Sequence, residues 1–138
     1  MKISLFFLII LLTALIFDPK LFSQSVPMPP VQMNENQISE NLLIGMKSCN
    51  KGLCASSTYL MGELCCQKGV IPLLSLLHNA ECEEIRILAA LSLCKIGDER
   101  GIYAVKRAAV FDGSDRVKRL CALFYKASKS GKIQVTRL

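Results

Sequence analysis

This chain of 138 residues has a single histidine. One histidine leaves no paired His–Glu motif for a catalytic metal, and the sequence also has no Gly-rich loop of the kind that cradles phosphates. Seven cysteines are present, but no two are spaced as C-x-x-C, which disfavours a structural zinc site. The composition therefore gives no support to metal or nucleotide chemistry, and we expect no cofactor.

One sequence pattern recurs at an interval of 32 residues. The segment 83–96 matches the segment 115–125 after it and, less closely, the segment 52–64 before it. Arg86 aligns with Lys118, and apolar positions align through all three copies. Repetition at a fixed interval of this length is typical of stacked helical hairpins, in which no single unit buries its own apolar face.

Each copy reads as two helices with apolar residues at helical spacing. Pro72 falls in a first helical turn, where its missing N–H is tolerated, and Gly97 suits a helix C-terminus. Asp98 and Asp112 are expected to cap the helices that follow them. Small residues such as Ala89 allow close helix packing. The predicted helices are 36–47, 52–66, 69–78, 83–95, 99–111 and 115–128. The predicted fold is all-α, a short α-solenoid of about three antiparallel hairpins.

The second copy carries a recognisable motif, since residues 85–98 read I-R-I-L-A-A-L-S-L-C-K-I-G-D. This resembles the HEAT-like repeats of phycobilisome lyases, whose second helix typically reads V-R-x-x-A-A-x-A-L-G-x-I-G-D. The resemblance spans residues 36–128 and departs from the motif at Cys54, which replaces the arginine in the first copy. It implies a right-handed α-solenoid fragment, and for most such proteins a role in protein binding or scaffolding.

The first residues, 1–23, are expected to be a signal peptide. Residues 3–17 form an apolar run, which is shorter than the roughly 20 residues of a membrane span and favours cleavage over a retained anchor. Cleavage is expected after Ser23 or, as a second choice, after Ser25. The proline-containing stretch 24–35 then acts as a linker. The protein is thus expected to be exported, periplasmic or secreted, and to meet the membrane only during export.

Charge is divided unevenly along the chain. Residues 24–99 contain five basic and eight acidic residues, a net charge of −3, whereas 100–138 contain ten basic and two acidic residues, a net charge of +8. The last stretch, 129–138, is basic and too short for another hairpin, so we expect a frayed tail. Such a basic end attracts an anionic partner. Nucleic acid is disfavoured, because basic and aromatic residues are not interleaved.

Four residues are candidate partner contacts: Arg86, Lys118, Arg119 and Lys126. The expected partner is another protein with an acidic surface. For Arg86 the sequence favours a structural role instead, in which it pairs with a turn acid such as Asp112 of the next repeat. For the rest of the basic surface, a solvated face that favours solubility is the plain alternative.

The cysteines allow two interpretations. An exported protein often uses cysteines in disulfides, and Cys49 and Cys54 are separated by only a turn. Cys121, however, aligns with Ala89, a small buried position. We therefore expect most of these thiols to be free and to act as small apolar side chains, with one or two disulfides as the rival interpretation. The seven are Cys49, Cys54, Cys65, Cys66, Cys82, Cys94 and Cys121.

The leading functional hypothesis is a non-enzymatic exported binding or scaffold module. A lyase-type or cofactor-handling role follows only from the resemblance, and His78 with Cys82 lacks a third residue to form a catalytic or metal site. A third hypothesis is a self-assembling envelope protein. Neither terminal hairpin shows a clearly polar outer face in the sequence, so both ends are expected to bind a partner or to self-associate.

Overall fold

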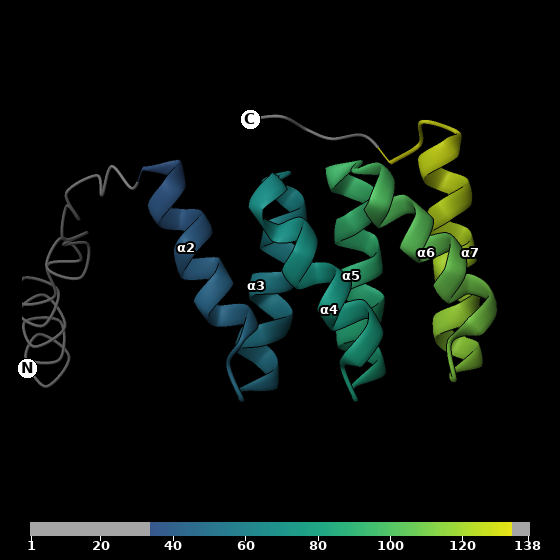
Figure 1. Ribbon diagram of the computed structural model, residues 1–138, viewed down its shortest axis with the longest axis horizontal. Helices are drawn as coiled ribbons and strands as arrows, with labels where there is room; N and C mark the ends of the chain where they lie inside the picture. Colours follow the sequence, from purple (N-terminus) through teal and green to yellow (C-terminus); the bar gives the residue numbers. More distant parts are fainter. Residues whose placement is uncertain (1–33, 134–138) are drawn as a thin grey trace, which may run out of the picture. The chain divides into compact units, whose positions relative to one another are not determined.

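The computed structural model describes residues 34–133, and this part of the chain is built from helices (Figure 1). No strand occurs between residues 34 and 133, which confirms the predicted all-α class. Six α-helices and one short 3-10 helix follow one another there. They are α2 (Glu35–Met46), α3 (Lys51–Glu63), η2 (Gln67–Gly69), α4 (Val70–Asn79), α5 (Glu83–Ile96), α6 (Glu99–Phe111) and α7 (Asp115–Lys129).

Several expectations fall outside the described residues. These are the signal peptide (1–23), all but the last two residues of the linker (24–35), and residues 134–138 of the basic tail. Within the tail, Lys129 is still the last residue of α7 and residues 130–133 form turn and bend. None of the helices between residues 34 and 133 has the length and apolar character needed to cross a membrane.

The helices pack in successive pairs, α2 with α3, α4 with α5, and α6 with α7 (Figure 1). The second helices form one row, in which α5 contacts both α3 and α7, while α4 contacts α6 in the other row. Each pair lies over the preceding one in the register of the sequence repeat. Three side-chain hydrogen bonds join residues 32 positions apart: Lys68 Nζ to Asn36 Oδ1, Lys95 Nζ to Glu63 Oε1, and Arg116 Nη1 to Glu84 Oε1.

The helix ends follow the sequence in most places. Gly97 ends α5 in the left-handed conformation with φ of 77°, and the Asp98 carboxylate accepts hydrogen bonds from backbone N–H groups in the first turn of α6. The predicted cap of the last helix is wrong. Ser114, not Asp112, accepts the N-terminal hydrogen bond of α7, because the Asp112 carboxylate is held by an arginine from the preceding helix pair.

The predicted helix 52–66 ends earlier, at Glu63. The cause is Cys65, which adopts a positive φ of 48°, a conformation that terminates a right-handed helix. Cys65 lies 32 residues before Gly97, so the first repeat uses the same left-handed turn without the glycine that favours it. The Cys65 thiol donates a hydrogen bond to the carbonyl oxygen of Gly62 at 3.5 Å.

The hydrophobic core runs between the two rows of helices. As the sequence predicted, Ala89 is fully buried and Cys121 shares that environment. The buried core residues are Met46, Met61, Val70, Leu73, Leu77, Ala89, Ala90, Leu93, Cys94, Ile96, Val105, Val117 and Cys121. Each α-helix between residues 34 and 133 contributes at least one of them. The core is therefore continuous, and no helix pair encloses it alone.

A close helix approach joins α3 to α5 at Gly62. A Cβ atom on Gly62 would lie 2.6 Å from Ser92 Cα, and this backbone atom cannot move away by a change of side-chain rotamer. One turn earlier the Ser92 hydroxyl donates a hydrogen bond to the carbonyl oxygen of Thr58 at 2.8 Å. The distance between these two helices is therefore set by the absence of a side chain at one position.

We predict that Gly62→Ala destabilises the fold by about 2 kcal/mol, because the added methyl group overpacks a rigid helix contact. The measurement is the free energy of unfolding in urea. Gly113→Ala is the control, since a Cβ atom there meets nothing within 4 Å, and its effect should stay within about 0.5 kcal/mol. Equal stabilities for the two variants would contradict the proposed close contact.

Candidate functional site

An ion pair between Arg86 and Asp112 joins the second helix pair to the third. Arg86 Nε donates to Asp112 Oδ2 and Arg86 Nη2 donates to Oδ1, both at 3.1 Å, so the pair is bidentate. Arg86 Nη1 also donates to the carbonyl oxygens of Ala80 at 2.7 Å and Glu81 at 3.1 Å. We call this arrangement the Arg86–Asp112 clamp. It confirms that Arg86 pairs with Asp112.

The clamp is largely shielded from solvent. The exposed fraction of the side chain is 14% for Arg86 and 8% for Asp112. Asp112 Oδ1 also accepts a hydrogen bond from the backbone N–H of Ser114 at 2.9 Å. Because its bonds reach the α4–α5 turn, α5 and the α6–α7 turn, the clamp fixes how the third helix pair sits on the second.

A groove of about 330 Å³ lies beside the clamp, between α4 and α6. Its apolar lining comes from Leu74 and Leu77 on α4 and from two alanines on α6. Its polar lining comes from the clamp, from His78 and from Arg107. We call it the α4–α6 groove. A hollow lined by apolar side chains together with a few polar groups is the usual form of a binding site.

The rim of the α4–α6 groove carries an exposed aromatic residue. Phe111, at the end of α6, has an exposed fraction of 74%, and the Arg107 guanidinium lies 5.7 Å from its ring centre. Tyr103 and Val110 are also exposed on α6. Exposed aromatic and arginine side chains next to each other are characteristic of protein-binding surfaces.

The four sequence-predicted contact residues are not brought together. Arg86 lines the α4–α6 groove, but its guanidinium is engaged by the clamp. Lys118, Arg119 and Lys126 all lie on α7 and do not line the groove. Lys118 forms an ion pair with Asp115 at 2.9 Å, which lowers the pKa of that carboxyl.

Sequence reasoning missed Arg107 and Phe111. They are four residues apart on α6 and thus share one helix face, which the sequence does show. The sequence alone does not show that this face borders a groove, because α4 forms its other wall.

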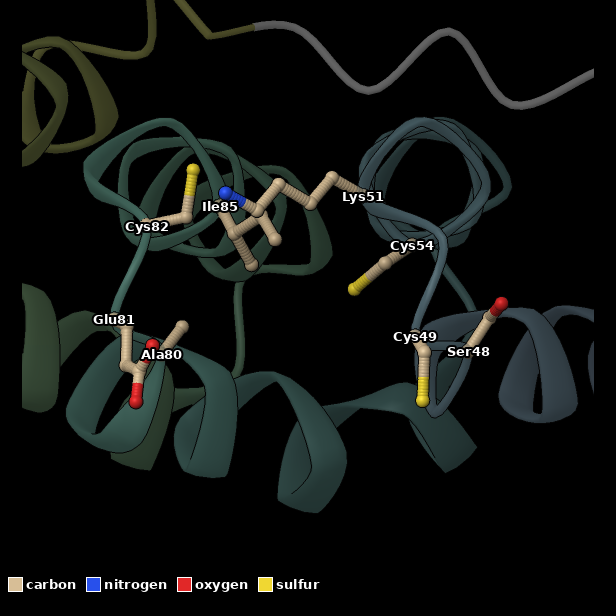
Figure 2. Close-up of a pocket in the computed structure, with 8 residues that line it drawn as sticks. All are labelled: Ser48, Cys49, Lys51, Cys54, Ala80, Glu81, Cys82 and Ile85. Carbon is tan, nitrogen blue, oxygen red and sulfur yellow. The ribbon is translucent and has the colours of Figure 1, made fainter.

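The clamp position differs between the three copies. Cys54 lies 32 residues before Arg86, and Ala80 lies 32 residues before Asp112, so the junction between the first and second helix pairs has neither of the two charges. A hollow of about 310 Å³ remains there, lined by both residues (Figure 2). Cys54 Sγ donates to the carbonyl oxygen of Met46 at 3.2 Å, a hydrogen bond within the first helix pair that does not link this pair to the second.

Three cysteines line this hollow: Cys49, Cys54 and Cys82 (Figure 2). Cys49 is exposed and Cys54 is buried, and both are free thiols in the structure. Cys82 Sγ donates to Glu84 Oε2 at 2.9 Å, and this hydrogen bond is the main reason why the pKa of Glu84 falls to about 2. Among residues 34–133, no group of three or more His, Cys, Asp or Glu side chains is placed to hold a metal ion.

Two other thiols lie in the core. Burial raises the pKa of Cys94 to about 11 and that of Cys121 to about 12. A thiol with such a pKa is almost entirely protonated near neutral pH, and the thiolate is the reactive form. These two side chains therefore act as small apolar residues.

The chain was compared with known proteins. No model of a protein family, no curated protein and no solved structure matches it.

We predict that Arg86→Met lowers the free energy of unfolding by about 3 kcal/mol, because it leaves the buried Asp112 carboxylate unpaired. Urea unfolding measures the change. Arg100→Met is the matched control, since Arg100 pairs with Asp98 but its side chain is 64% exposed, and its loss should be much smaller because solvent screens the pair. A loss for Arg86→Met no larger than that of the control would show that the clamp does not stabilise the fold.

We also predict selective thiol labelling of the folded protein. At pH 8 a maleimide should modify the exposed Cys49 rapidly, whereas Cys94 and Cys121 react only after unfolding. Peptide mass spectrometry of samples labelled with and without urea measures this. In urea all three should react at similar rates, and rapid labelling of Cys121 in the folded protein would contradict its burial.

Proposed function

We propose that the protein is a non-enzymatic, exported binding module, and that its helix pairs form a short α-solenoid of the HEAT-like kind. The support for the solenoid is the set of contacts between residues 32 positions apart, together with the two rows of helices. Stacks of this kind present their binding residues on surfaces that run across several repeats.

The α4–α6 groove is the proposed binding surface. The observation that carries this proposal is Phe111, a large aromatic side chain that is 74% exposed at the rim of the groove beside Arg107. An aromatic ring left in water on an otherwise packed helix gains most when a partner covers it.

The chemistry of the groove indicates the partner. Arg86 and Asp112 neutralise each other, which leaves Arg107 as the strongest uncompensated charge on the groove wall. The leucines and alanines of the groove can pack against an aliphatic or aromatic side chain, and the Arg107 guanidinium can donate hydrogen bonds to a carboxylate. The proposed partner is an acidic protein segment that places one apolar residue in the groove. Export rests on the sequence of residues 1–23 alone.

Selection of peptides from a random display library against the full chain tests this function. We predict that the selected peptides combine acidic and apolar residues, and that Arg107→Glu or Phe111→Ser weakens their binding at least tenfold by fluorescence anisotropy. Higher salt should weaken binding to the parent chain.

The control for this experiment is the double variant Arg119→Glu/Lys126→Glu on α7, which should bind the same peptides normally. If this control loses binding and the groove variants keep it, the basic face of α7 is the binding surface and the groove is not. If no peptide is enriched, the proposed binding function is wrong.

A further inference from the structure

Three leucines form an apolar stripe on α3, at the first end of the row of helices (Figure 1). Leu53, Leu60 and Leu64 have exposed fractions of 50, 45 and 46%. Their spacing of seven and four residues puts them on one helix face. Thr58 and Gly62, which contact α5, lie on a different face. We call the three leucines the α3 edge.

The repeat shows what the α3 edge is suited to contact. The residues 32 positions later are Ile85, Ser92 and Ile96 of α5, and all three are buried. Ser92 is the residue that bonds to Thr58 on the preceding second helix. In α5, therefore, this face packs against another helix. In α3 the same face is apolar and half exposed.

The other end of the row, formed by α7, differs from the α3 edge because it carries charged residues. The two α7 positions that lie 32 residues after Ile87 and Cys94 of α5 are Arg119 and Lys126, and both are exposed. These two cations lie on the same face of α7 as Leu123, which is 59% exposed, so the outer face of the last hairpin is mixed in character and not purely apolar. Head-to-tail stacking would place these two cations against the α3 edge, where their burial without partners is unfavourable.

We propose that the α3 edge is a two-fold interface between two copies of this chain, in which the two α3 helices pack antiparallel. The edge is complementary to itself, because this arrangement sets Leu53 of one copy near Leu64 of the other. Ser56, a small residue between Leu53 and Leu60 on the same side, leaves room for Leu60 of the second copy.

Charge favours the antiparallel orientation. Glu35 and Glu40 lie in the first half of α2, whereas Lys47 follows the last residue of α2, at the turn that joins α2 to α3. The antiparallel two-fold arrangement brings the acidic end of one copy beside the basic turn of the other, and a parallel arrangement would bring like charges together. The interface shares no residue with the α4–α6 groove, so this inference goes beyond the proposed function.

The test compares two variants of the full chain by sedimentation velocity. Leu60→Lys places a charge in the centre of the interface and should raise the dissociation constant of the dimer at least a hundredfold. The control, Leu123→Lys, changes a leucine on α7 that is 59% exposed and should leave the dimer intact. A parent chain that is still monomeric at about 100 µM would overturn the proposal, because even a weak dimer has a dissociation constant below that concentration. Equal weakening by both substitutions would also overturn it.

A photo-crosslinking amino acid at position 60 identifies what covers the edge. We expect crosslinked pairs of double mass whose peptides join position 60 of one chain to α3 of another. A crosslink within one chain to residues 1–33 would mean that the protein's own N-terminal segment covers the edge, and a crosslink only to a different protein would identify a foreign partner. Either result would overturn the two-copy interface.

Discussion

The structure depends on one constraint: each helix pair is too small to bury its apolar side, so it must lie on another pair. α5 shows this most clearly, because it contacts α3 in the pair before it and α7 in the pair after it. Ser92 meets Thr58 and Gly62 on α3, and Cys94 packs in the same buried cluster as Cys121 of α7. A substitution on a face where two helix pairs meet therefore affects the packing of both pairs.

The repeats share a backbone arrangement but differ in how they are joined. Between the second and third pairs the Arg86–Asp112 clamp makes two hydrogen bonds across the junction, and Arg86 makes two more to carbonyl oxygens of its own pair. Between the first and second pairs Cys54 and Ala80 stand at the same positions and leave a hollow. In the last copy Lys118 forms an ion pair with Asp115 on its own helix. The same sequence position is thus used for an ion pair between helix pairs, for a thiol beside a hollow, and for an ion pair within one helix.

The sequence was sufficient to predict the positions of the helices and one tertiary contact. Helix spacing and the 32-residue interval placed all six α-helices within a few residues, and the pairing of Arg86 with Asp112 followed from the same interval. Predictions from the sequence were wrong where the outcome depends on an unusual backbone conformation or on contact with a second helix. Cys65 gives no sign of its positive φ, and Asp112 is diverted from capping by a residue 26 positions away. The sequence did not predict most of the candidate site, because Arg107 and Phe111 border a groove only when α4 packs opposite α6 and forms its other wall.

The two ends of the row differ in a way that bears on function. A stack whose ends are both apolar adds further copies without limit, whereas a stack with one polar end and one apolar end can close after a single association. Arg119 and Lys126 place two positive charges beside Leu123 at the α7 end, whereas the leucines of the α3 edge make the other end apolar. The α4–α6 groove, with Phe111 on its rim, lies nearer the α7 end and is left free by an association at the α3 edge. The distribution of apolar surface thus separates the proposed site for self-association from the proposed site for a partner, which an open-ended assembly would not do.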